Sequence, residues 1–181
     1  MNLRITQGIF KNKKIDIPNS AKPLRERVKL AVFSIIGDKI INAKCLDLFA
    51  GSGNLGIEAV SRGADSCTFV DNDYNAIKSI LNNIANLNIQ DDKHLLAVKD
   101  EATKYVSNDA THYDVIFMDP PYDLPVKHVL KMIDTMLNKS GIIIYFRSKN
   151  NLIDVELENP NLKIIDSRKY GITRVDFIHR K

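Results

Sequence analysis

The residues from Asp119 to Tyr122 are the stretch of this chain that is best suited to chemistry. They follow an apolar run, residues 114–118, which predicts a buried strand. In open α/β sheets, ligands bind beyond the carboxyl ends of the strands. Asp119 and the carbonyl of Pro120 could accept the two hydrogens of a planar amine, because the prolines leave this turn little freedom. Pro121 stiffens the turn further, and Tyr122 could stack on the ring that carries the amine. The alternative is a strand-ending turn with a tyrosine in the core.

A glycine-rich turn lies between a second apolar run and a predicted helix start. Gly51, Gly53 and Gly56 match the pattern G-x-G-x-x-G, in which the backbone approaches a bound cofactor closely. The amides at such a helix start favour a negative group, either a pyrophosphate or an amino-acid carboxylate. Asp71 is expected at the end of the next strand, where an acid can hold both ribose hydroxyls. The predicted residues of a nucleoside-cofactor site are therefore Phe49, Ala50, Gly51, Ser52, Gly53, Asp71 and Asn72.

Two further aspartates bear on the choice of cofactor. Asp47 lies four residues before Gly51 and could accept a hydrogen bond from an ammonium group. S-adenosylmethionine has such a group and a dinucleotide does not, so S-adenosylmethionine is the predicted cofactor and S-adenosylhomocysteine the product. Asp100, with Glu101 beside it, could accept from the adenine amine; alternatively, Asp100 caps the helix that begins at Glu101.

The elements that must hold these residues alternate along the chain between strand-like and helical patterns. The expected strands span residues 45–50, 66–70, 95–98, 115–118 and 142–146, and the expected helices span residues 55–62, 75–87, 101–106 and 126–137. Two extended runs near the end, residues 162–169 and 173–179, predict a closing antiparallel hairpin. The pattern predicts an α/β fold, Rossmann-like, with a mostly parallel seven-stranded sheet and helices on both faces.

The first part of the chain predicts two smaller elements. Residues 3–10 and 14–17 predict a small β-hairpin with a basic tip. Apolar residues at helical spacing predict an amphipathic helix over residues 24–41, with Arg25 and Arg27 in its first turn. We expect a single domain over residues 1–181, in which a hairpin appendage, residues 1–20, precedes a catalytic core, residues 24–181.

Charge is distributed unevenly along the sequence. The formal net charge is +4, but residues 1–29 alone carry eight basic and two acidic side chains. A basic front end on a near-neutral body indicates contact with a nucleic-acid backbone. Alternatively, an AT-biased coding background has scattered lysines that have no function. The predicted RNA-binding residues are Arg4, Lys11, Lys13, Lys14, Lys22, Arg25 and Arg27.

Several classes of protein are not expected. The sequence has neither a run of roughly 18 apolar residues, as a membrane span needs, nor a secretory signal, so we expect a cytosolic protein without a membrane partner. Cys45 and Cys67 lie in apolar runs, which predicts reduced core residues. The four histidines show no paired ligand spacing, so we expect no metal.

Taken together, these motifs resemble the RsmD family of class I S-adenosylmethionine-dependent methyltransferases. The matching segments are residues 4–8, 22–29, 49–59 and 169–171, with Asp71 and the corner at 119–122. The resemblance implies transfer of a methyl group to the exocyclic N2 amine of a guanine in 16S ribosomal RNA, free or in the assembling small subunit. We also expect a monomer. Asp119, Pro120, Pro121 and Tyr122 would be the catalytic residues. The chain departs from the family pattern at Leu24, Glu26 and Arg147, where threonine, aspartate and glutamate are usual.

Other functions are compatible with parts of this pattern. The same chemistry could act on adenine N6 in DNA or RNA, or on a protein glutamine. A DNA enzyme normally needs a separate recognition region, and a glutamine enzyme usually has asparagine in place of Asp119. An NAD-dependent oxidoreductase would use the glycine turn but leaves residues 119–122 unexplained. A catalytically idle RNA-binding scaffold would not need the acidic residues.

Overall fold

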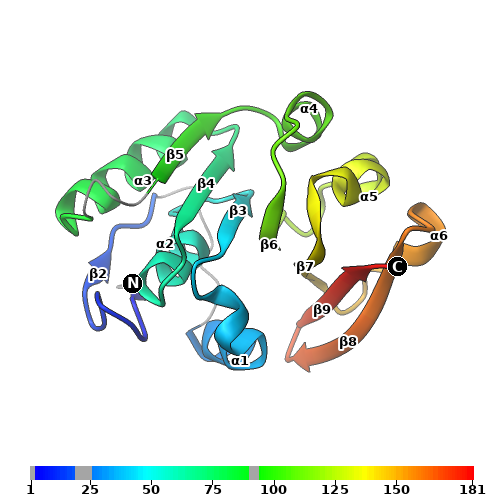
Figure 1. Ribbon diagram of the computed structural model, residues 1–181, viewed down its shortest axis with the longest axis horizontal. Helices are drawn as coiled ribbons and strands as arrows, with labels where there is room; N and C mark the ends of the chain where they lie inside the picture. Colours follow the sequence, from blue (N-terminus) through cyan, green and yellow to red (C-terminus); the bar gives the residue numbers. More distant parts are fainter. Residues whose placement is uncertain (1–2, 19–25, 90–93) are drawn as a thin grey trace.

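The computed structural model describes residues 3–18, 26–89 and 94–181. Two of the predicted RNA-binding residues, Lys22 and Arg25, lie outside this range. Within it, seven strands form one twisted sheet in the order β5-β4-β3-β6-β7-β9-β8 (Figure 1). They are β3 (Lys44–Leu48), β4 (Ser66–Asp71), β5 (His94–Lys99), β6 (Tyr113–Met118), β7 (Leu137–Ser148), β8 (Leu162–Tyr170) and β9 (Thr173–Arg180). Strands β3 to β7 are parallel, and β9 runs antiparallel to both of its neighbours. The predicted fold class is confirmed.

Helices pack on both faces of this sheet. The described helices are α1 (Glu26–Ile36), α2 (Asn54–Ser61), α3 (Tyr74–Asn86), α4 (Ala102–Asn108), α5 (Lys127–Met132) and α6 (Val155–Glu158), with the 3-10 turns η1 (Gly37–Ile40) and η2 (Ile133–Met136). Apolar residues of α1, α2 and α3 form one core with the sheet, and those of α4 and α5 form a second core on the other face. Burial of these two faces supplies the main drive for the fold.

The N-terminal hairpin is shorter than predicted. Its strands are β1 (Leu3–Arg4) and β2 (Lys14–Ile15), which pair antiparallel. The expected strand over residues 3–10 ends early because the amides of Thr6 and Gln7 donate to a side chain, Glu58, and not to a neighbouring strand. The expected helix over residues 24–41 also ends early, at Ile36. Gly37 follows with a φ of +56°, a left-handed conformation that interrupts the α-helix.

A buried carboxylate joins the N-terminal segment to the rest of the protein. Glu58 of α2 forms an ion pair of 2.8 Å with Lys29 of α1, and both side chains are fully buried. The same carboxylate accepts hydrogen bonds from the amide and hydroxyl of Thr6, from the Gln7 amide and from Arg62. Lys29 also donates to the carbonyl of Arg4. Three segments that are far apart in the sequence therefore converge on Glu58.

The burial of Lys29 reduces the number of basic residues in the front end that a nucleic acid could contact. Lys29 counts among the eight basic residues of the front end, but its ammonium group is inside the protein. Desolvation lowers the pKa of Lys29, and the charge of Glu58 opposes that effect. Lys29 is therefore not available to bind a nucleic acid.

The hairpin is also fastened at its other side. The Ile9 amide donates to the carbonyl of Ser61, and the Phe10 amide donates to the hydroxyl of the same residue. After β2, the Asp16 amide donates to Asn83 of α3, and the Asn83 side chain donates to the Asp16 carbonyl and to the carbonyl of Ser52. The hairpin thus lies along α2 and reaches α3 near the glycine turn.

The two cysteines are buried and unbridged, which confirms the prediction for Cys45 and Cys67. Burial raises the pKa of both thiols far above the ordinary value, so neither is a thiolate at neutral pH. Over the described ranges, no helix combines the length and the apolar character that crossing a bilayer requires.

Replacing Glu58 with glutamine should destabilise the protein strongly. The Lys29 ammonium would remain buried without a counter-ion, and breaking such a pair typically costs about 3–5 kcal/mol. Urea unfolding measures this free energy. The double variant Glu58→Gln/Lys29→Met should lose less stability than Glu58→Gln alone, because it also removes the unpaired buried charge of Lys29.

As a matched control, Glu158→Gln removes the ion pair between Glu158 and Lys127, whose side chain is largely exposed. This substitution should lower the stability by less than about 1 kcal/mol. A Glu58→Gln variant as stable as this control would show that the buried carboxylate is not a structural anchor.

Candidate functional site

Three aspartates meet at the carboxyl edge of the sheet. Asp47 lies in β3, Asp71 ends β4, and Asp119 directly follows β6; these three strands are neighbours. Asp47 is level with Phe69 and Phe117, both of which belong to the core beneath α1, α2 and α3. Because side chains alternate along a strand, all three carboxylates are directed to this face. The fold therefore brings together three acidic residues that the sequence places far apart.

Burial raises the pKa values of Asp47 and Asp119, and repulsion adds to the effect at Asp47. Asp47 is 1% exposed, and burial raises its pKa to about 8. A hydrogen bond from the Gly56 amide, 2.8 Å long, favours the ionised form, while the charges of Asp119 and Asp71 oppose it. Burial also raises the pKa of Asp119 to about 7. A positively charged ligand at this edge would relieve the repulsion and lower both pKa values.

The glycine turn bends sharply over the end of the sheet. Phe49, Gly51 and Gly53 all have positive φ angles, of 68°, 54° and 75°. The amides of Phe49 and Ala50 both donate to the carbonyl of Val70, and the Gly51 amide donates to the Asp71 carboxylate at 2.8 Å. A positive φ is strained for phenylalanine, and such strain persists only where the surroundings enforce it.

The third glycine of the pattern has a packing role. A Cβ atom on Gly56 would lie 2.3 Å from the ring of Phe69 and 2.6 Å from the sulfur of Cys67. Only glycine lets α2 approach β4 so closely, as the third position of the fingerprint requires. Ser52, within the turn, is buried, and its carbonyl accepts from Asn83.

Asp71 is held by backbone amides on both of its oxygens. One oxygen accepts from Gly51 and the other from Asp73, which caps α3. Each carboxylate oxygen keeps a second acceptor site. Asn72, beside it, is exposed. Asp71 is therefore fixed in place and still able to accept from a ligand.

Asp100 lies at the next strand end and is not the cap of the helix. Its amide donates to the Asp71 carbonyl, which joins the ends of β4 and β5. Helix α4 begins at Ala102, and its N-cap position belongs to Glu101. The Asp100 carboxylate accepts from the Glu101 amide and lies 3.3 Å from the ammonium group of Lys104. The alternative of Asp100 as an N-cap is wrong by one residue.

The corner after β6 keeps its acceptor free. Within the described residues, the Asp119 carboxylate accepts no hydrogen bond. Pro120 is buried, and Pro121 closes a turn by accepting from the Leu124 amide. The Tyr122 side chain is 41% exposed, and its hydroxyl forms a hydrogen bond of 2.7 Å with Thr173 at the start of β9. An open aromatic ring thus lies close in sequence to a carboxylate that accepts no hydrogen bond from the described part of the chain.

The predicted RNA-binding residues do not all lie at this edge. Among the described ones, Arg4, Lys11, Lys13, Lys14 and Arg27 are exposed. Arg4 donates to the carbonyl of Asn12 across the hairpin. Residues 9 and 10, just before the basic tip, contact the C-terminal end of α2, which is the end farther from the glycine turn.

Arg147, one of the departures from the resembling family, has a structural role. It is buried in β7 and forms an ion pair of 2.6 Å with Asp176 of β9. It also donates to the carbonyls of Asn151 and Ile153 in the following loop. The guanidinium therefore joins β7, β9 and that loop, and within the described chain it forms no hydrogen bond or ion pair with residues 119–122.

Some residues near the site could not be recognised from the sequence. Asn54, the first residue of α2, accepts from Lys29 through its Oδ1, and its buried Nδ2 has no partner among the described residues. Glu58 and Lys29 lay in the matching segments, but the sequence gives no signal that they pair. Nothing in the sequence pointed to Thr173.

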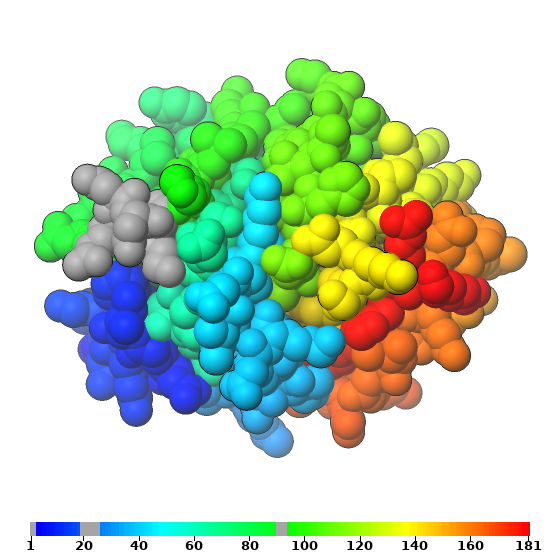
Figure 2. Space-filling view, viewed as in Figure 1, coloured from blue at the N-terminus to red at the C-terminus, as the bar shows by residue number. Residues whose placement is uncertain are grey.

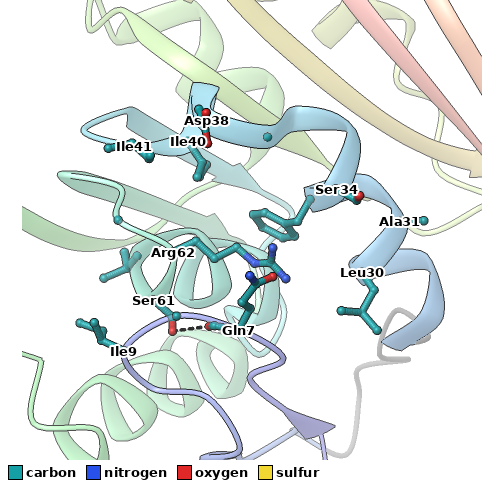
Figure 3. Close-up of a pocket in the computed structure, with 15 residues that line it drawn as sticks. Gln7, Ile9, Leu30, Ala31, Ser34, Asp38, Ile40, Ile41, Ser61 and Arg62 are labelled. Atoms are coloured by element: carbon teal, nitrogen blue, oxygen red, sulfur yellow. Dashed lines mark hydrogen bonds between the residues drawn. The ribbon is translucent and has the colours of Figure 1, made fainter.

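A wide cavity of about 1110 Å³ lies elsewhere, between α1, η1 and the end of α2 (Figure 3). Its lining includes Gln7, Ile9, Leu30 and Arg62. None of the predicted site residues lines it, so the candidate site is the sheet edge and not this cavity.

Comparison with known proteins gives the family. The profile of a family described as Conserved hypothetical protein 95 matches residues 3–179. The chain belongs to this family. Its curated relatives include "Putative rRNA methyltransferase YlbH" of Bacillus subtilis, 34% identical over 96% of this chain and 96% of the relative. "Ribosomal RNA small subunit methyltransferase D" of Buchnera aphidicola (Acyrthosiphon pisum) is 33% identical over 89% of this chain and 81% of the relative. The predicted membership of an RsmD-type methyltransferase family is confirmed.

Solved structures share the fold. "Putative methyltransferase yhhF" from Escherichia coli superposes with a TM-score of 0.86 at 23% identity, covering 100% of this chain and 99% of that chain. The Thermus thermophilus 16S rRNA N2 G1207 methyltransferase, in complex with AdoMet and guanosine, has a TM-score of 0.77 at 15% identity and covers 100% of this chain and 50% of that chain.

Proteins of this family depend on S-adenosylmethionine, and the site fits that cofactor. Its sulfonium and ammonium groups are positive, and the edge offers Asp47, Asp71 and Asp119. Asp71 would suit the ribose of either cofactor, but Asp47 and Asp119, when ionised, would repel the pyrophosphate of NAD. The charge pattern therefore counts against the oxidoreductase alternative on physical grounds. The described residues also hold no cluster of His, Cys, Asp and Glu that could bind a metal ion.

The raised pKa of Asp47 predicts a pH-dependent stability. In the unfolded chain the carboxyl ionises near its ordinary value of 3.8, whereas in the folded protein it keeps its proton until about pH 8. Stability from this group therefore falls as the pH rises from about 4 to 8. Asp47→Asn can still accept a hydrogen bond from the Gly56 amide but does not ionise. The melting temperature of this variant should therefore fall less between pH 4 and pH 8 than that of the unmodified protein.

For a chain of this size, each kcal/mol of lost folding stability lowers the melting temperature by about 2–4 °C. The matched control is Asp65→Asn, an exposed aspartate at the opposite edge of the sheet. Melting curves of Asp47→Asn that run parallel to those of the unmodified protein between pH 5 and pH 8 would contradict the buried protonated carboxyl.

Proposed function

We propose that this protein transfers a methyl group from S-adenosylmethionine to the exocyclic N2 amine of a guanine in small-subunit ribosomal RNA. The observation that carries the proposal is the corner formed by Asp119, Pro120, Pro121 and Tyr122 at the acidic sheet edge. It offers an acceptor to which no described residue donates, a rigid turn and an exposed ring, which are the features that a planar aromatic amine needs. The names of the curated relatives support ribosomal RNA as the substrate.

The cofactor residues have separate tasks in this proposal. Asp71 accepts from the two ribose hydroxyls through its free acceptor sites, and Asp47 faces the ammonium group. The turn from Phe49 to Gly53 lets the backbone approach the amino-acid part without intervening side chains. Asn72, Asp100 and Glu101 border the adenine, with the Asp100 carboxylate accepting from its amine.

The reaction requires mainly positioning. S-adenosylmethionine supplies a methyl group that is already activated by the sulfonium, so the protein must align the amine with it. Asp119 and the Pro120 carbonyl accept the two N–H groups of the amine and direct its lone pair toward the methyl group. As positive charge builds on nitrogen, the ionised Asp119 stabilises it and can take the proton. Tyr122 stacks on the guanine, which must be unstacked from its neighbours to enter.

The RNA contacts come from the basic front end. Exposed Arg4, Lys11, Lys13, Lys14 and Arg27 can neutralise phosphates, with Lys22 and Arg25 as further candidates. In the view of Figure 2, the N-terminal hairpin (blue) and the C-terminal hairpin (orange to red) lie on opposite sides of α1. We also propose that the chain acts as one domain, as a monomer in the cytosol, on free 16S RNA or the assembling subunit.

Gene deletion tests the proposed function directly. Mass-spectrometric mapping of ribosomal RNA from the deletion strain should show the loss of one N2-methylguanosine from the small subunit. The unmodified gene should restore it. Loss of N6-methyladenine, or of a glutamine methylation with an unchanged RNA map, would assign the protein to one of the alternative substrates.

Asp119→Asn is the matched variant for the chemical step. It introduces an N–H donor where an acceptor is required, and loss of such a group typically costs about 10²–10⁴-fold in rate. Transfer of tritiated methyl groups to small-subunit RNA should fall accordingly, while calorimetry should show that cofactor binding persists. Asp71→Ala should do the reverse and weaken cofactor binding first.

The pKa of about 7 for Asp119 adds a pH signature. In the free protein, kcat/KM should fall with one-proton dependence below about pH 7, because the protonated carboxyl can neither stabilise the positive charge on the amine nitrogen nor take its proton. Undiminished turnover of Asp119→Asn would remove Asp119 from the mechanism.

Charge reversal tests the RNA interface. Replacing Lys11, Lys13 and Lys14 with glutamate should weaken RNA binding and flatten its dependence on salt, because fewer counterions are released. Filter binding at several salt concentrations measures both. The matched control reverses three exposed lysines elsewhere, Lys131, Lys139 and Lys163, and should have the smaller effect. If both triple variants weakened RNA binding equally, the hairpin lysines would have no specific role in the RNA interface.

A further inference from the structure

The aromatic ring at the corner is held from a distant part of the chain. The Tyr122 hydroxyl and the Thr173 hydroxyl are 2.7 Å apart, and the two residues are 51 positions apart in the sequence. The ring remains 41% exposed, whereas Thr173 is only 8% exposed. The bond therefore ties an accessible ring to a buried anchor.

The anchor itself is rigid. Thr173 begins β9 and is paired with Ser148 of β7 on one side and with Tyr170 of β8 on the other. The carbonyl of Ile172 accepts from the Lys149 amide, which fixes the turn to the end of β7. Gly171, with a φ of +62°, provides the left-handed residue that a tight hairpin turn favours.

The strand register explains why Thr173 can reach the corner. Met118 of β6 is level with Tyr145 of β7, so continuing the register past the end of β6 brings Pro121 level with Ser148. Ser148 is the partner of Thr173. Because β9 is antiparallel, its first residue lies at the edge where the parallel strands end.

A tethered ring has an energetic advantage over a free one. An exposed tyrosine samples several side-chain orientations, and fixing such a side chain on binding costs about 0.5–1.5 kcal/mol. A hydroxyl tether removes that freedom before the base arrives. Stacking needs one ring orientation, so the tether prepares the site for a planar substrate.

We propose that Thr173 is a positioning residue, whose hydroxyl holds the Tyr122 ring in the orientation that stacks on the target base. This inference rests on the proposed function and deepens it, because it extends the substrate site to the C-terminal hairpin. Thr173 itself touches neither the base nor the cofactor in this arrangement.

The test compares Thr173→Val, which keeps the shape but lacks the hydroxyl, with Thr173→Ser, which keeps the hydroxyl. The substrate is small ribosomal subunits, or RNA extracted from them, from the deletion strain. The valine variant should raise KM for this substrate about two- to tenfold, the effect of losing one net hydrogen bond. Stacking acts in both the bound complex and the transition state, so kcat should change little.

Further variants separate positioning from folding. Thr173→Ser should restore the original KM, and calorimetric affinity for S-adenosylmethionine should stay the same in all variants. Tyr122→Phe should match Thr173→Val, and combining the two should add nothing, because both remove the same bond. Thr135→Val removes a hydroxyl bond to the Met132 carbonyl far from the corner and serves as the control.

Two results would overturn the role of Thr173. One is a KM for Thr173→Val equal to that of the unmodified protein. The other is a loss confined to kcat and melting temperature that serine does not rescue, which would mean a structural role. Absence of methyl transfer by the unmodified protein would count against the proposed function instead. In that case NMR of ¹³C-labelled tyrosine still decides the tether: Tyr122 ring resonances must change in Thr173→Val and not in Thr173→Ser, or the inference fails.

Discussion

The buried carboxylate of Glu58 is the constraint on which the rest of the structure depends. It binds Lys29 of α1, the amides of the segment after β1, and Arg62 of its own helix. A buried ion pair adds little net stability, because desolvation offsets the attraction, but it penalises every arrangement in which the charges are separated. Its effect is therefore to set the position of α2. Since α2 starts at the glycine turn, the same carboxylate indirectly fixes the backbone that faces the cofactor.

At the acidic edge of the sheet, by contrast, like charges lie close together. Asp47, Asp71 and Asp119 repel one another, and the buried Asp47 is protonated more readily than an ordinary aspartate. Such an arrangement costs stability in the absence of a ligand and favours a cation when one binds. At this edge, burial raises the pKa of both Asp47 and Asp119. Elsewhere, as at Arg147 and Asp176, buried charges are paired with each other.

The sequence was sufficient to predict the sheet and the acidic edge, and insufficient for the contacts between distant segments. Parallel strands buried on both faces are continuous apolar runs, so β3, β6 and β7 were recognisable, as was the turn at Gly51. The two strands of the N-terminal hairpin were predicted too long, because alternation cannot reveal that Glu58 captures the amides that would extend β1. Lys29 was counted as surface charge for the same reason, since its partner lies 29 residues away. The one-residue error at Asp100 reflects how little local sequence fixes a helix start.

The direction of β9 gives the C-terminal hairpin a place in the site. A strand parallel to its neighbours enters the sheet at the edge opposite the corner, so its first residue cannot approach Tyr122. Reversing one strand brings its start, Thr173, to the edge where β6 and β7 end. The hairpin turn at Gly171 then sets which residue arrives there. Tyr170 and Gly171 thus affect the corner only indirectly, because the turn that they form sets the position of Thr173. If Thr173 positions Tyr122 as proposed, the antiparallel end of the sheet and the acidic edge form one substrate site.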